Sequence, residues 1–238
     1  MKNHNQELFE TIKKFKKISK REYKFLPVAK EEDIVIFENK FKVKLPSEYR
    51  WFLLNIANGI ISKKDWNFDI LDKIDFKNYW CNDEYDPSIS FELDKRVLFS
   101  EPEEDEDIDN YPYETYLAYN MEVHNFYNCY KTGVIHISDE GCGTYSMLVV
   151  KGNEYGNVWT NDIASNREIY PEYDKENNKK RLNFIEWIIR VMKSQIKSHY
   201  LHLASEKREI ELKKESGEWD ISDQFLYSLK TLWNKIIN

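Results

Sequence analysis

The stretch that decides the fold spans residues 38–59, with the sequence ENKFKVKLPSEYRWFLLNIANG. In its second half, apolar side chains recur at i, i+3, i+4 and i+7, a pattern typical of an amphipathic helix: Tyr49, Phe52, Leu53 and Ile56. Pro46 stands at the entrance of this helix, where its fixed φ suits the first turn, and we expect Ser47 as the N-cap. We expect Asn58-Gly59 to stop the helix, because glycine accepts the left-handed conformation that ends many helices.

Helical periodicity also marks both ends of the chain. Residues 5–19 and 30–41 are predicted helices, and the first of them turns Lys13, Lys14, Lys16 and Lys17 to solvent. The period returns from Arg181 onward and again in a last helix, with apolar positions at Ile185, Ile188, Ile189, Met192, Ile196 and Tyr200, then at Phe225, Leu229, Leu232 and Ile236. Polar residues dominate the stretch between these two helices.

The middle of the chain is rich in short β-forming runs. Residues 134–138, 144–150 and 157–160 are such runs, and the links 139–143 and 151–156 have the length and glycine content of hairpins. This pattern predicts an antiparallel meander. Further expected elements before it are strands at residues 66–70 and 91–99 and a helix at residues 116–130.

Helices, then strands, then helices is the order typical of an α+β fold, here an antiparallel meander sheet packed against N- and C-terminal helices. We divide the chain into a helical extension, a central α+β domain and a second helical extension, at residues 1–29, 30–195 and 196–238.

Composition narrows the class of protein. The chain has 238 residues, of which 41% are hydrophobic and 15% aromatic, so it can build a core. No apolar run reaches the roughly 18–20 residues that a membrane helix needs. Residues 1–24 lack the continuous apolar stretch and the cleavage site of small residues that are typical of a signal peptide, so we expect none there. The three cysteines, Cys81, Cys129 and Cys142, are too scattered for a disulfide framework or a zinc site. We therefore expect a soluble, reduced protein of the cytoplasm.

Charge is unevenly placed along the chain. The formal net charge is −7, but residues 1–50 carry +5 and residues 51–120 carry −11. This balance disfavours direct binding to nucleic acid, which needs cations to displace counterions from phosphate. Carboxylates are densest in the acidic run, which we define as Glu101, Glu103, Glu104, Asp105, Glu106, Asp107 and Asp109. The run is either a solvated loop or a surface that attracts a basic partner, and its neighbours Tyr111 and Tyr113 are residue types that interface hot spots use.

These residues carry a family resemblance. Glu38 at a helix end, Phe41, and the pattern Leu45, Pro46, Tyr49, Asn58 and Gly59 resemble the N-terminal signature of the SUKH superfamily, the Smi/Knr-like proteins. The run 134–150, with its turn at Gly141 and Gly143, is similar to the second signature of that family. Gly156–Trp159 and the helix around 184–189 look like its later strand and closing helix, so the resemblance covers about residues 30–195.

The resemblance implies a non-enzymatic bacterial immunity protein that binds and neutralises a cognate polymorphic toxin, such as a nuclease, by occluding its active site. It implies no cofactor, no metal and no membrane partner, and we expect the free protein to be a monomer. The signature residues have structural roles under this interpretation. The alternative is a regulatory scaffold or adaptor of the Smi/Knr cell-wall signalling type.

Other constellations of reactive side chains fit catalysis or metal binding less well. His136, Asp139 and Cys142 include the residue types of a nucleophilic site, but they lie too close together in the chain for a usual triad. His199 and His202 have a zinc-compatible spacing without a third ligand. Asp105, Asp107 and Asp109 imitate the start of an EF-hand loop, whose glycine and glutamate are missing.

Overall fold

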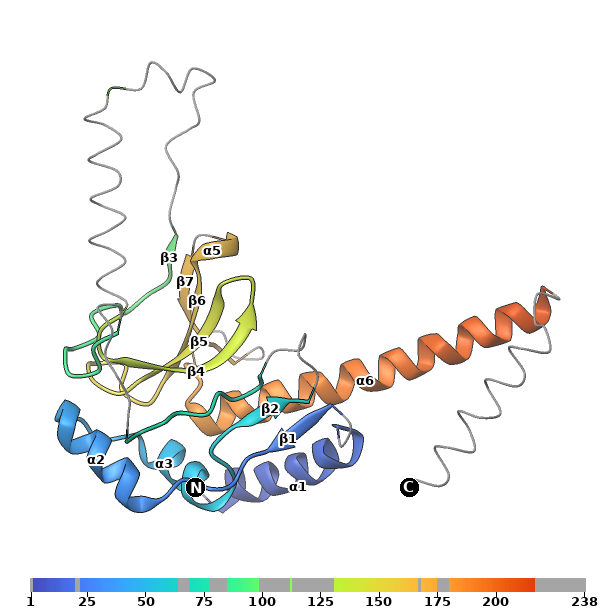
Figure 1. The fold of residues 1–238 in the computed structure, drawn as a ribbon. Helices are drawn as coiled ribbons and strands as arrows, with labels where there is room; N and C mark the ends of the chain where they lie inside the picture. The colour runs from blue at the N-terminus through green and yellow to red at the C-terminus, as the bar shows by residue number, and fades with distance from the viewer. Residues whose placement is uncertain are drawn as a thin grey trace. The chain divides into compact units, whose positions relative to one another are not determined.

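The computed structural model describes residues 2–19, 22–63, 69–77, 85–98, 112, 131–166, 168–174 and 180–216 (Figure 1). The chain forms two compact units, residues 1–191 and residues 192–238, each of which we describe by itself.

Three helices open the first unit: α1 at Lys2–Ser19, α2 at Glu31–Phe41 and α3 at Ser47–Asn55. Their positions confirm the helices predicted from the apolar period. Ser47 is the first residue inside α3, and Pro46 occupies the N-cap position without a side-chain cap bond, so the expected role of Ser47 is wrong. The hydroxyl of Ser47 donates instead to its neighbour Glu48, at 2.8 Å.

Gly59 does not end α3. The helix stops at Asn55, four residues before Gly59, and its C-cap Ile56 has a right-handed conformation. Gly59 has φ +126°, and a Cβ there would lie 3.2 Å from both the Leu71 carbonyl oxygen and the Lys73 nitrogen. Glycine is therefore needed because another segment passes close to this backbone, and not because a helix ends there.

The strands form two antiparallel sheets, which together with the helices confirm the α+β class. The small sheet pairs β1 (Tyr23–Phe25) with β2 (Ile60–Ser62). The larger sheet has the order β3-β7-β6-β5-β4. Its strands are β3 (Val97–Leu98), β4 (Val134–Gly141), β5 (Thr144–Val149), β6 (Val158–Asp162) and β7 (Glu168–Pro171).

The meander of β4, β5 and β6 confirms the three predicted β-rich runs. The turn between β4 and β5 is only two residues long, Cys142 and Gly143, with φ of +52° and +77°. Two positive φ angles suit a tight hairpin turn that follows the twist of the strands.

The other predictions in this region fare differently. The expected strand at residues 91–99 is wrong over most of its length: β3 contains only two residues, and Phe91 makes an isolated bridge to Gly152. A short helix, α5 at Ile163–Asn166, separates β6 from β7. Residues 66–68, the helix expected at 116–130 and the last helix at 225–236 lie outside the described residues.

Apolar side chains on one face of the larger sheet form a core cluster with Phe91. Its members are Phe91, Val134, Met147, Val149, Trp159 and Ile169. A Cβ at Gly133 would lie 2.4 Å from the Phe91 nitrogen, and a Cβ at Gly152 would lie 2.5 Å from the Phe91 carbonyl oxygen. Both glycines thus allow the Phe91 segment to pass against the sheet.

The helix α6 runs from Phe184 to Glu215, and its residues from Met192 onward belong to the second unit. It begins at Phe184, three residues after the expected start at Arg181. It also continues through residues 205–215, a polar stretch predicted to separate two helices. No side chain from Lys193 to Ser216 is buried. Within the described residues, no helix is long and apolar enough to cross a membrane.

Candidate functional site

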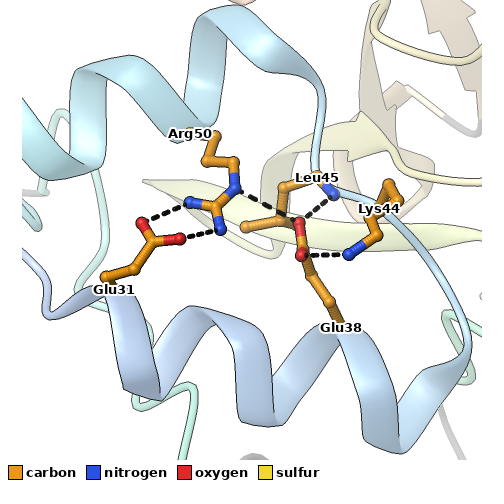
Figure 2. A network of polar contacts seen from close by, with 5 residues as sticks. All are labelled: Glu31, Glu38, Lys44, Leu45 and Arg50. Carbon is orange, nitrogen blue, oxygen red and sulfur yellow. Dashed lines mark hydrogen bonds and ion pairs between the residues drawn. The ribbon is translucent and has the colours of Figure 1, made fainter.

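A buried carboxylate organises the signature stretch between α2 and α3 (Figure 2). The side chain of Glu38 is only 1% exposed. One of its oxygens accepts the Leu45 backbone N–H at 2.9 Å, and the other accepts the Lys44 ammonium at 2.9 Å. The Arg50 guanidinium lies 3.6 Å from Glu38 as well. A buried charge is tolerated only when it is paired and hydrogen-bonded, and this one is both.

Arg50 extends this network to the solvent side. Its two terminal nitrogens donate to the two oxygens of Glu31 on α2, at 2.7 and 2.5 Å. The hydrogen bond and the nearby positive charge lower the pKa of the Glu31 carboxyl, although burial opposes the shift. Because Arg50 lies on α3 and both glutamates lie on α2, the network fixes the two helices against each other. This network therefore has a structural role in the packing of α2 and α3.

The aromatic residue of the signature is buried too. Tyr49 is 0% exposed, and its ring meets Phe184 at the start of α6 edge-on, with the centroids 4.6 Å apart. Phe52, one turn later, contacts the same Phe184 ring at 5.3 Å. These contacts join α3 to the first turn of α6.

A largely buried polar cluster lies on the sheet face opposite the Phe91 cluster, where Ser146, Thr160 and Asp162 are at most 7% exposed. We call it the carboxylate face, and it comprises Glu140, Ser146, Thr160, Asp162, Tyr170, Glu172 and Arg190. Ser146 donates to Glu140, and Thr160 donates to Glu172 at 2.6 Å. Arg190 of α6 donates to Glu172 at 2.5 Å.

Three carboxylates and one guanidinium give this face an excess of negative charge. Burial raises the pKa of Glu140, and repulsion from Glu172 and Asp162 adds to the shift, while the Ser146 hydrogen bond and Arg190 oppose it. Burial, followed by the charges of Glu172 and Asp162, raises the pKa of Tyr170 to about 12. Its hydrogen bonds are made within the fold: Thr144 donates to Asp162 at 2.7 Å, and Thr160 and Arg190 donate to Glu172. In the described residues, no group of three or more His, Cys, Asp or Glu side chains is arranged to hold a metal ion.

The sequence was compared with models of known protein families, with curated proteins and with solved structures. Residues 28–190, more than half of the chain, match the SMI1 / KNR4 family (SUKH-1). The chain belongs to this family. The match confirms the resemblance drawn from residues 38–59 and 134–159. No curated protein and no solved structure matches the chain.

Several residues predicted to bind a partner lie outside the described part of this SUKH-1 chain. They are all seven carboxylates of the acidic run, together with Tyr111 and Tyr113. Their role stays a prediction, as does the division of the chain at residues 29 and 195.

His136, Asp139 and Cys142, the residue types of a nucleophilic site, have separate roles in the structure. Asp139 accepts the Gly141 N–H at 2.8 Å, and Cys142 is exposed in the turn. His136 lies between two tyrosine rings, stacked on Tyr145 at 4.7 Å and edge-on to Tyr85 at 4.2 Å. No hydrogen bond among the described residues joins the three side chains, so they form no triad.

The environment of His136 makes it a poor base. Its Nε2 atom is buried and has no hydrogen-bond partner among the residues that the structure describes. Burial lowers the pKa of His136 to about 4, although the negative charge of Asp139 opposes the shift. Burial and the charges of Asp69 and Asp139 raise the pKa of nearby Asp72 to about 6. His136 is therefore neutral near pH 7, with its ring engaged in packing.

The carboxylate face was not predicted from the sequence, although the pattern of polar and apolar residues along β5 indicates part of it. Ser146 lies between Tyr145 and Met147 on β5, a pattern that indicates the face on which it lies. Thr160 is followed by Asn161 and Asp162 on β6, so its own strand gives no such pattern. Glu172 and Arg190 join them only through tertiary contacts. The pairing of β6 with β7, which aligns Thr160 with Tyr170, was not predicted.

Proposed function

We propose that this protein is an immunity protein that binds one cognate toxin in the cytoplasm and neutralises it by occluding its active site. The observation that carries the proposal is membership of the SMI1 / KNR4 family over residues 28–190. The signature residues of this chain support it, because they are used for folding and not for chemistry.

The partner that best fits this chain is a basic toxin, such as a nuclease with a positively charged substrate groove. The acidic run would stand in for phosphate in that groove and would speed association. An immunity protein of this kind makes and breaks no bond, so tight and rapid binding is all that it requires.

Copurification tests the class of function. The tagged full-length chain, expressed in its own host, is expected to bring down one toxin domain in a 1:1 ratio. Coexpression with that toxin should restore growth. Recovery of several unrelated partners with no protection would instead support the scaffold alternative and would overturn the immunity proposal.

Charge reversal tests the electrostatic part. We expect Glu103→Lys, Glu104→Lys, Asp105→Lys and Asp107→Lys together to lower the association rate with the copurified toxin about tenfold or more at low salt. The difference should shrink at high salt, because salt screens exposed charges.

A matched control makes the same change in net charge at four exposed carboxylates elsewhere: Glu32, Glu92, Asp94 and Glu215. These reversals should change the association rate much less than those in the acidic run. Equal rates for the acidic-run variant and the unmodified protein would remove the electrostatic part of the proposal.

A further inference from the structure

Helix α1 lies outside the family match. The match begins at residue 28, whereas α1 spans Lys2–Ser19 and belongs to the same compact unit as the matched residues. Its apolar face is buried: Leu8 and Phe15 are 0% exposed and Ile12 is 6% exposed. The helix is thus an addition that packs firmly and presents its other face to solvent.

That outer face is basic. Lys13, Lys14, Lys16 and Lys17 are all exposed and occupy the last two turns of α1. None of the four forms an ion pair with a carboxylate among the described residues. The acidic residues of the helix, Glu7 and Glu10, lie in its first half.

Aromatic rings lie along the same flank as two of these lysines. Phe9 is 52% exposed, and its ring meets Trp51 of α3 edge-on with the centroids 5.9 Å apart. Lys16 places its ammonium 4.3 Å from the centroid of the Phe25 ring. Because Phe9, Lys13 and Lys16 are separated by four and three positions, they lie above one another on the helix.

We propose that this flank, formed by Phe9, Lys13, Lys16 and Trp51, is an interaction surface for an acidic peptide segment that carries an aromatic side chain. Carboxylates of the peptide would pair with the two lysines, and its aromatic side chain would pack on the exposed ring of Phe9. Neither lysine pairs with a carboxylate among the described residues, so a peptide carboxylate would bind without breaking an ion pair, and Lys16 would keep its contact with the Phe25 ring.

Two other anionic partners fit the surface less well. A lipid surface is bound by a helix that inserts its apolar side chains, and those of α1 are buried in the fold. Nucleic acid is bound by many cations spread over a positive surface, whereas this chain has a net charge of −7. A short acidic segment matches the small size of the lysine cluster.

The test measures binding of the full-length chain to a fluorescein-labelled (Glu-Glu-Phe)4 peptide by fluorescence anisotropy. We expect saturable binding at about 50 mM NaCl that weakens about tenfold at about 300 mM NaCl, as salt screens exposed pairs. Lys13→Glu with Lys16→Glu should weaken binding at least tenfold. The control pair Lys73→Glu and Lys77→Glu, exposed on another segment, should change it less than about twofold.

A second arm tests the aromatic contact. The unmodified chain should prefer (Glu-Glu-Phe)4 over (Glu-Glu-Ser)4, and Phe9→Ser should abolish the preference while leaving the salt dependence. Far-UV circular dichroism of each variant confirms that α1 still folds.

Three outcomes would overturn the inference. They are no binding of either peptide, equal binding by the Lys13/Lys16 variant and the control pair, and tighter binding of a single-stranded RNA dodecamer or of anionic phosphatidylserine vesicles than of the peptide. The inference goes beyond the proposed function and its test uses no toxin. The immunity proposal therefore stands or fails separately, in the copurification and growth assays.

Discussion

His136 shows how a side chain with catalytic potential is used for packing. Its imidazole stacks on Tyr145, and no described residue makes a hydrogen bond to its buried Nε2 atom. A neutral ring fits there, whereas an imidazolium would be a largely buried charge that the charge of Asp139 offsets only in part. The sequence neighbours that had suggested a nucleophilic site, Asp139 and Cys142, serve the hairpin turn instead.

This environment predicts an acid-sensitive contribution to stability. The pKa of His136 is lowered to about 4 in the folded protein, while the unfolded value is near the ordinary 6.5. The unfolded chain therefore binds the proton more tightly, and the contribution is fully present above pH 6.5 and is lost as the pH falls toward 4. His136→Phe keeps the ring contacts and removes the titration. Its free energy of unfolding should gain about 3 kcal/mol relative to the unmodified protein between pH 7 and pH 4.

Urea denaturation at a series of pH values measures this difference directly. Other titrating groups, Asp72 among them, are common to both proteins and largely cancel. His202→Phe is the control, because it replaces a histidine that is 71% exposed on α6. Parallel pH profiles for the His136 variant and the unmodified protein would contradict the burial argument.

At the scale of elements, the pairing of α2 with α3 depends on one carboxylate. We expect Glu38→Gln to lower the free energy of unfolding by about 1–3 kcal/mol, because the amide still accepts the Leu45 N–H but leaves Lys44 and Arg50 without their buried counter-charge. Thermal or urea denaturation measures the loss.

The matched control is Glu31→Gln, which removes the exposed partner of the same Arg50. An exposed ion pair contributes little, so this variant should lose less stability than Glu38→Gln. Equal losses in the two variants would show that burial of Glu38 is not what matters.

The elements that were predictable are those with a strong local signal. The helices α1, α2 and α3 follow from a 3.6-residue apolar period, and β4, β5 and β6 follow from β-forming runs between glycines. The strands β1, β2 and β7 are only three or four residues long, too short to show an alternating pattern. Their pairing is decided by tertiary contacts.

The same distinction explains the two errors around α3. Ser47 and Gly59 are typical of helix ends, yet Pro46 takes the cap position and Gly59 serves a close approach of the residue 71–73 backbone. The role of Glu38 was suggested by the family resemblance, but its burial was not visible, because its partners depend on how the chain turns at residues 42–46. The carboxylate face was missed because it is assembled from strands and α6.

At the scale of the whole molecule, α6 joins two regions of different burial. In its first turns, Phe184, Ile185, Trp187 and Ile188 are at most 2% exposed, while from Lys193 onward no described side chain is buried. The later turns carry ion pairs such as Lys207–Glu211 at 3.8 Å, and exposed pairs of this kind stabilise a helix only weakly.

Local stability should therefore fall along this helix. We expect backbone amides of residues 200–215 to exchange with deuterium at least about tenfold faster than those of residues 187–191, because opening the outer turns exposes little additional apolar surface. Hydrogen-exchange mass spectrometry with overlapping peptides resolves the two regions, and the buried strand β6 supplies the reference for full protection. Four apolar side chains in the outer turns are exposed: Tyr200, Leu201, Leu203 and Leu212. Uniform protection along α6 would contradict the argument and would mean that another surface covers these side chains in solution. Protection that appears only when the copurified partner is added would locate that surface on the partner.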